Sequence, residues 1–225
     1  MNEREIALDT ETTGLEPKDG HRIVEIGCVE LRNRIPTGAT FQAYLNPDRD
    51  VPKEAEAVHG ISSEFLKDKP RFSAVVGDFL AFIGDARLII HNADFDVKFL
   101  NAELTHARKP EIMKERVFCT LKYARKKFPG APASLDALCR RFNVDTTART
   151  KHGALMDAEF LAAMYLELMG GSQVALELAG KTVESAQIAA AKREVLPARP
   201  HTPSPEEIAA HEVFLKKIKQ PLWAE

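Results

Sequence analysis

Two carboxylates, Asp9 and Glu11, stand two positions apart where a short apolar segment runs into a turn at Gly14. The segment 5–14 has the pattern of a buried strand that leads into a glycine turn. Side chains alternate between the faces of a strand, so both carboxylates share the face of Ala7, about 7 Å apart at about 3.3 Å per residue. Such charges repel unless a cation lies between them, and carboxylates suit Mg²⁺ or Mn²⁺. A metal site is one interpretation of the pair, and a strand cap that begins a turn is the other.

Two further carboxylates, Asp96 and Asp157, fall on the apolar stripes of expected helices. A carboxylate on a buried stripe is costly unless it is paired or bound to a metal. Both acids are therefore candidates for the same site as Asp9 and Glu11. The stripe residues are Phe99, Leu100 and Leu104 for Asp96, and Leu161, Met164 and Leu168 for Asp157.

One histidine, His152, precedes the second of these helices and is followed by Gly153. Residues five positions apart in a regular helix diverge by about 140°. We therefore expect His152 on the loop before the helix, with Gly153 supplying a bend that turns it toward Asp157. Four acids and one histidine at strand ends and on inward stripes are placed so that they can converge.

The remaining pattern predicts an α/β domain. Residues 22–31 and 40–45 are expected to form strands that make an antiparallel meander with the first, and 87–91 and 116–119 to form strands reached through helices. Helices are expected between Pro70 and Gly84, from residue 93, and over 121–127, 135–142 and 155–169. Residues 51–61 are expected to form an irregular loop, whose Glu54 and His59 are either solvated or functional.

Composition limits the class of protein. The 225 residues are 44% hydrophobic and 28% charged, which is typical of a soluble globular chain. A protein that binds nucleic acid without a partner is usually strongly basic, whereas this chain has a formal net charge of −2. Three cysteines without metal-ligand spacing indicate buried thiols in a reducing cytoplasm, and neither a signal peptide nor a membrane span is expected.

Beyond Gly170-Gly171 the chain changes character. Residues 196–205 hold several prolines and are expected to form an extended linker. A short helix is expected to begin at Pro205 with Ser204 as its N-cap. Its apolar side chains have no domain to pack into, which favours a docking segment over a disordered end. These side chains are Ile208, Val213, Phe214, Leu215, Ile218, Leu222 and Trp223.

Three motifs together resemble the DEDDh family of 3′→5′ exonucleases: residues 9–14 (DTETTG), 91–96 (HNADFD) and 152–158 (HGALMDA). The resemblance implies a ribonuclease H-like mixed five-stranded sheet flanked by helices and followed by an extended C-terminal tail. It also implies two divalent ions, Mg²⁺ or Mn²⁺, with His152 as the general base. In the implied site Asp9 touches both ions, Glu11 and Asp157 hold one, and Asp96 holds the other through water.

The same resemblance implies a substrate site beside the metals. Glu54 and His59 match positions that touch the terminal nucleotide, and Asp9, Glu11 and Asp157 reach it as well. Phe95 matches the aromatic residue beside the terminal base, although packing in the core is an equally good interpretation of that ring.

Residues 58–61, 134–139 and 206–212 extend the resemblance to the members of this family that proofread for bacterial replicative DNA polymerases. Residues 169–205 keep little of that pattern. The resemblance implies three partners: the catalytic (alpha) subunit of the polymerase, the sliding clamp (beta), and a single-stranded or frayed 3′ end of DNA. An RNA-trimming exonuclease and a structural tether between polymerase and clamp are the alternatives.

The chain is accordingly expected to divide into three parts. Residues 1–171 would form the nuclease domain, 172–204 a clamp-binding motif and linker, and 205–225 the polymerase-docking segment. The expected clamp-binding residues are Gln173, Leu176 and Leu178, and the expected polymerase-binding residues are Phe214, Leu215, Ile218, Leu222 and Trp223.

Overall fold

The computed structural model of the chain describes residues 3–147, 151–171 and 202–218. The chain divides into two compact units, residues 1–175 and 176–225. Each unit is described here by itself.

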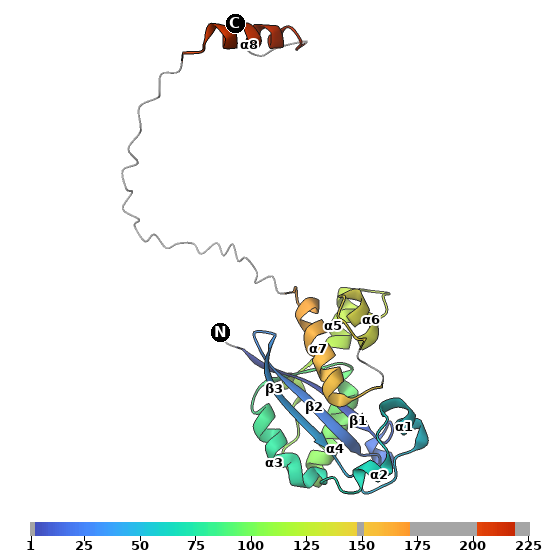
Figure 1. Ribbon diagram of the computed structural model, residues 1–225. Coiled ribbons are helices and arrows are strands. Elements are labelled where there is room, and N and C mark those ends of the chain that lie inside the picture. Colours follow the sequence, from blue (N-terminus) through green and yellow to red (C-terminus); the bar gives the residue numbers. More distant parts are fainter. Residues whose placement is uncertain (1–2, 148–150, 172–201, 219–225) are drawn as a thin grey trace, which may run out of the picture. The chain divides into compact units, whose positions relative to one another are not determined.

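The first unit is built on one five-stranded sheet with the strand order β3-β2-β1-β4-β5 (Figure 1). Neighbours β1–β2 and β2–β3 are antiparallel, whereas β4 lies parallel to both β1 and β5. The expected mixed sheet, with a meander and two parallel strands, is confirmed. The strands are β1 (Arg4–Thr12), β2 (Ile23–Arg32), β3 (Ile35–Tyr44), β4 (Arg87–Ile90) and β5 (Val117–Cys119).

The third strand begins at Ile35, earlier than the expected start at residue 40. Asn33 and Arg34 both have positive φ angles, 51° and 69°. Two such residues make the tight turn that matches the twist of a hairpin, so pairing resumes at once between Arg32 and Ile35. The sequence lacks the usual Asn-Gly signal, and the early start of the strand was therefore missed.

The prediction of an irregular loop over residues 51–61 was wrong, because residues 53–59 form helix α1. Its first turn holds Glu54 and Glu56, which the helix dipole favours, and Gly60 ends it with a left-handed φ of 75°. The helices are α1 (Lys53–His59), α2 (Ser63–Leu66), α3 (Phe72–Ile83), α4 (Ala93–His106), α5 (Thr120–Lys127), α6 (Leu135–Arg141) and α7 (Ala154–Leu168), with 3₁₀ turns η1 (Pro17–Asp19) and η2 (Lys114–Arg116).

The helices cover both faces of the sheet (Figure 1). Ile6 and Leu8 of β1 pack with α3 and α4 in one hydrophobic cluster. Ala7, on the opposite face of the same strand, packs with α5, α6 and α7 in another. The alternation predicted for β1 is thus confirmed, and a helix from each layer begins near the end of this strand.

The second unit contains α8 (Pro205–Leu215). Its N-cap is Ser204, as predicted, and Glu207 completes a capping box with hydrogen bonds of 3.2 and 2.8 Å. Ile208, Val213 and Phe214 are exposed. Gln173, Leu176, Leu178, Leu222 and Trp223 lie outside the described residues. Among the helices that the structure describes, none has the length and apolar character to cross a membrane.

His91, at the end of β4, yields a prediction on pH and stability. Its Nδ1 lies 3.0 Å from Oγ1 of Thr120, the first residue of α5, and burial lowers its pKa to about 4. The pKa of histidine in the unfolded chain is about 6.5. The neutral, buried His91 ring therefore contributes its full share of the unfolding free energy above that pH, and this contribution is lost as the pH falls toward about 4. Between pH 7 and pH 5 the wild type should lose about 1–2 kcal/mol more unfolding free energy than His91→Asn. Urea unfolding at both pH values measures this, and equal losses would contradict it.

Candidate active site

Glu11, His152 and Asp157 form a cluster in which one ligand atom from each lies within 4.8 Å of the others. Glu11 comes from β1, Asp157 from the first turn of α7, and His152 from the loop before that helix. His152 Nδ1 is 3.0 Å from Asp157 Oδ2. The Asp157 carboxylate is 5% exposed and the His152 ring 47%. His152 therefore lies on the loop and faces Asp157, as the spacing predicted.

Gly153 does not supply the expected bend, and that prediction was wrong. Its φ of −156° and ψ of 129° describe extended backbone that any residue adopts. A Cβ at this position would lie 3.9 Å from Glu25 Oε2, an ordinary contact. His152 is held by a backbone hydrogen bond of 3.3 Å from its N–H to the Val58 carbonyl of α1 and by the contact of its ring with Asp157.

Glu25 of β2 caps helix α7 from outside the helix. Its Oε2 accepts a hydrogen bond of 3.0 Å from the backbone N–H of Ala154, and its Oε1 accepts one of 2.8 Å from Gln42. The carboxylate satisfies an orphan donor and complements the positive end of the helix. The sequence analysis missed this residue. The available signal was a charged residue inside an apolar strand, and Glu25 stands directly opposite Glu11 in the β1–β2 register.

Gly27 allows α7 to rest directly on the backbone of β2. A Cβ built here would lie 2.2 Å from Ala154 C and from Leu155 N. Gly27 is also the register partner of Asp9. The absence of a side chain at Gly27 therefore allows the start of α7 to lie close to β1, the strand that carries Asp9 and Glu11.

Asp96 approaches from the other layer. It is 3% exposed, and its Oδ1 accepts hydrogen bonds from Thr10 N at 3.1 Å and from Thr10 Oγ1 at 2.8 Å. Burial raises the pKa of Asp96 to about 7, although the bonds from Thr10 act in the opposite direction. Thr10 lies between Asp9 and Glu11, so Asp96 is tied to the same stretch of β1.

The structure brings four of the five predicted residues into two groups. Glu11, His152 and Asp157 form the cluster, and Asp96 is bonded to Thr10. Asp9 is half-buried on β1 between these groups. At the 4.8 Å spacing, the cluster found among the described residues does not include Asp9 or Asp96.

A cleft of about 580 Å³ opens beside Glu11. Of the six predicted substrate residues, Glu11, Glu54, His59 and Phe95 line it, whereas Asp9 and Asp157 are not among its lining residues. Phe95 also packs on Phe99 with 5.1 Å between ring centroids, so the ring contributes to packing as well as to the wall of the cleft. Leu15, which the sequence analysis missed, lines the cleft while 74% exposed.

His59 presents a defined tautomer to this cleft. Its Nδ1 accepts a hydrogen bond of 3.0 Å from Ile61 N, so the proton of the neutral ring is on Nε2. Burial lowers the pKa of His59, which keeps the ring neutral at pH 7. In the described part of the chain Nε2 is buried and is one of the side-chain atoms without a hydrogen-bond partner.

The donor set fits a divalent metal ion. Glu11 and Asp157 offer oxygen, His152 offers nitrogen, and the three atoms are close enough to share one small cation. Asp96, which is bonded to the neighbouring Thr10, has a raised pKa that a nearby cation would lower. The residues therefore match the metal requirement of DEDDh exonucleases.

Comparison with known proteins defines the class first. The exonuclease family RNase_T matches residues 6–165. Exonuclease X, solved in complex with 5′ overhanging duplex DNA, is 28% identical with a TM-score of 0.55 over 74% of this chain and 90% of that one. The nuclease domain of 3′hExo, a DEDDh family member bound to rAMP, has the same fold, with 19% identity and a TM-score of 0.63 over 75% of this chain and 92% of that one. Fold and family together define a metal-dependent 3′–5′ exonuclease.

Relatives that span nearly the whole chain narrow the class. DNA polymerase III subunit epsilon of Rickettsia felis is 49% identical over 224 residues, with 96% of each chain covered. The Escherichia coli subunit is 45% identical over 229 residues, covering 96% of this chain and 94% of its own. The chain belongs to the exonuclease family, and within it to the DNA polymerase III epsilon subunits.

Gly27→Ala tests whether the contact between α7 and β2 positions the site. The added methyl group must push α7 away, so we expect a loss of about 1–3 kcal/mol of unfolding free energy and a fall in exonuclease turnover of about a hundredfold. Gly77→Ala is the matched control, because nothing lies within 4 Å of a Cβ at that exposed position of α3. The control should retain full activity and gain about 0.5–1 kcal/mol. Equal activity in the two variants would contradict the positioning role.

Proposed function

We propose that the chain is the proofreading exonuclease of a bacterial DNA polymerase III. In this role it removes mispaired 3′-terminal deoxynucleotides by phosphodiester hydrolysis and releases nucleoside 5′-monophosphates in the cytoplasm. The observation that supports this most strongly is the Glu11–His152–Asp157 cluster beside a cleft of about 580 Å³. Identity of 49% to a polymerase III epsilon subunit supports the replicative context.

The carboxylates hold the metals in this proposal. Asp9, Glu11, Asp96 and Asp157 would be the residues that hold the two ions. Two bound Mg²⁺ or Mn²⁺ ions supply Lewis acidity for the attacking water and the scissile phosphate. Asp96 contributes a carboxylate whose orientation is fixed by Thr10.

His152 acts as the general base. A neutral imidazole that donates from Nδ1 to Asp157 Oδ2, 3.0 Å away, keeps Nε2 as a proton acceptor. Nε2 takes a proton as the water oxygen bonds to phosphorus. The bond between phosphorus and the 3′ oxygen of the preceding nucleotide breaks, and that oxygen becomes the new 3′ hydroxyl after it gains a proton.

The cleft binds the terminal nucleotide. Phe95 offers a ring face to the base, His59 forms part of the wall that contacts the nucleotide, and Glu54, exposed on the first turn of α1, accepts from a hydroxyl. Asp9, Glu11 and Asp157 approach the phosphate through the metals. Leu15, exposed at the same cleft, is placed to contact the base as well.

Two segments outside the nuclease site attach the protein to its partners. Gln173, Leu176 and Leu178 bind the sliding clamp, and Phe214, Leu215, Ile218, Leu222 and Trp223 bind the polymerase catalytic subunit. Support for the second contact comes from α8, whose Val213 and Phe214 are exposed. A chain with a formal net charge of −2 gains from partners that already hold DNA, because they raise its local concentration.

Digestion of a primer with a labelled, mismatched 3′ nucleotide in Mg²⁺ tests the activity. Asp9→Ala and Asp157→Asn should each reduce release of the labelled monophosphate by at least about a hundredfold, because each removes a metal ligand. Glu159→Gln, exposed on the same helix as Asp157, is the control and should digest at the wild-type rate. Circular dichroism should show the same folded content in all variants. Near-wild-type digestion by Asp157→Asn would remove it from the site, and a preference for RNA ends would favour the RNA-trimming alternative.

Binding to the polymerase catalytic subunit tests the role of α8. In the full chain, Phe214→Ala with Leu215→Ala should weaken the complex at least about tenfold, because each side chain is worth about 1.5–3 kcal/mol when buried. Ile35→Ala, which removes an exposed apolar side chain from the nuclease unit, should leave the affinity unchanged. Surface plasmon resonance measures both. Unchanged affinity in the double variant would place the polymerase contact elsewhere.

A further inference from the structure

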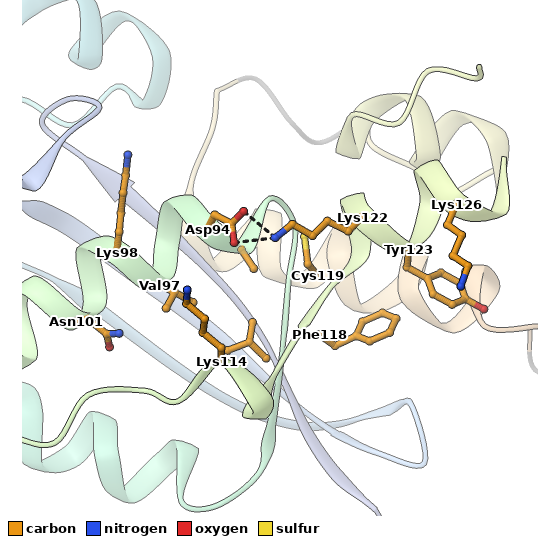
Figure 2. Close-up of a pocket in the computed structure, with 12 residues that line it drawn as sticks. Asp94, Val97, Lys98, Asn101, Lys114, Phe118, Cys119, Lys122, Tyr123 and Lys126 are labelled. Carbon is orange, nitrogen blue, oxygen red and sulfur yellow. Dashed lines mark hydrogen bonds and ion pairs between the residues drawn. The ribbon is translucent and has the colours of Figure 1, made fainter. Parts of the chain in front are cut away.

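A second hollow, of about 720 Å³, lies between α4, β5 and α5 (Figure 2). Four lysines line it: Lys98 of α4, Lys114 just before β5, and Lys122 and Lys126 of α5. Val97, Val117, Phe118 and Tyr123 supply apolar and aromatic lining. We call this hollow the lysine groove. Neither the metal cluster nor the substrate residues lie in it.

The charge in the lysine groove is strongly positive, although the whole chain has a formal net charge of −2. The one acid that lines the groove, Asp94, is already paired with Lys122 at 2.7 Å, and Figure 2 shows this lysine reaching from α5 toward α4. Lys114 and Lys126 are exposed, and no ion pair is formed by either within the described ranges. Lys122 and Lys98 are paired with Asp94 and Glu16, so the positive charge that the groove offers to a ligand comes chiefly from Lys114 and Lys126.

The lysine groove adjoins the active-site cleft through one side chain. Lys98 lines the groove, and its Nζ lies 2.5 Å from Oε1 of Glu16, which lines the cleft. The same ammonium stands 5.2 Å from the ring centroid of Phe95, the aromatic residue of the cleft. A polymer with one end in the cleft can therefore reach the groove by crossing the first turns of α4.

We propose that the lysine groove binds the phosphates of the single DNA strand upstream of the 3′-terminal nucleotide held in the cleft. This rests on the proposed function. Lysine ammonium groups bind phosphate as point charges, and single strands are held where positive charge lies beside aromatic surface. The strand enters the groove with its backbone toward Lys114, Lys122 and Lys126, and its bases lie near Phe118 and Tyr123.

An acidic peptide is the competing occupant, because β5 is the outermost strand of the sheet and has a free edge. Strand addition needs a length of exposed backbone on which to pair. β5 has three residues, Val117–Cys119, which is a poor template for an added strand. A nucleic-acid strand needs no such pairing and is favoured by the charge.

The full chain with Lys114→Gln and Lys126→Gln tests the proposal by the dependence of binding on strand length. Fluorescence anisotropy in EDTA measures affinity for a thymidine dodecamer and for a thymidine dinucleotide, without hydrolysis. The dodecamer should bind about tenfold more weakly to the variant. A plot of log affinity against log salt concentration has a negative slope, and its magnitude should decrease by about 1.4, the value for two lost phosphate contacts. Dinucleotide affinity should not change, because that ligand ends inside the cleft.

Arg32→Gln with Arg34→Gln is the matched control. It removes the same two charges from the β2–β3 hairpin, at the end of β2 opposite to Glu25. Affinity for both ligands should stay at the wild-type value. In Mg²⁺ the lysine double variant should show a raised KM and an unchanged kcat on the dodecamer, and unchanged hydrolysis of the dinucleotide.

Two outcomes would overturn the proposal. Equal dodecamer affinity in the lysine variant and the arginine control would show that the strand avoids the groove. Loss of binding to the polymerase catalytic subunit, with DNA binding intact, would assign the groove to a protein partner. Because binding in EDTA needs no catalysis, a failure of the proposed exonuclease activity would be seen separately, as wild-type protein that does not hydrolyse DNA.

Discussion

The contact between the start of α7 and the backbone of β2 is the constraint on which the rest of the site depends. A helix can approach a strand this closely only where the strand has no side chain, and Gly27 provides that gap. The same approach carries the Ala154 N–H to Glu25, so the helix is both packed and capped by one strand. His152 and Asp157 reach Glu11 because their helix is seated at this point.

The opposite layer meets the same strand by a different interaction. Thr10 uses its backbone N–H and its hydroxyl to bind Asp96, a buried acid on α4. Since adjacent residues of a strand face opposite layers, Thr10 reaches α4 while Asp9 and Glu11 stay on the side of α7. Three consecutive residues of β1 thus connect both helical layers. Such a site tolerates little displacement of either layer, because the carboxylates must share cations at fixed distances.

Much of this arrangement follows from periodicity. The apolar stripes of α4 and α7 were sufficient to predict that Asp96 and Asp157 are buried, and both are 3% exposed, whereas the buried acids Glu5, Glu25 and Glu103 were not predicted. The mixed sheet, with a meander and two parallel strands, was predicted from the pattern of strands and helices, whereas the order of the strands was not predicted. What periodicity cannot show is contact between elements. Glu25 and Gly27 contact a helix that is distant in the sequence, and Leu15 lines a cleft formed by several elements. These roles depend on strand register and on the space between elements, which the local sequence pattern does not indicate. Helix α1 was missed because seven residues with three apolar positions, Ala55, Ala57 and Val58, give too short a period to recognise.

The capping box of α8 has a consequence for how quickly and how tightly a partner is engaged. A helix of 11 residues is only marginally formed in isolation. When only a fraction of molecules is helical, the apparent dissociation constant is the intrinsic one divided by that fraction. Ser204 and Glu207 satisfy two orphan donors before any partner arrives, which raises the helical population. A change at Ser204 would therefore lower the affinity of the proposed polymerase contact by reducing the helical population, although Ser204 is not one of the proposed contact residues.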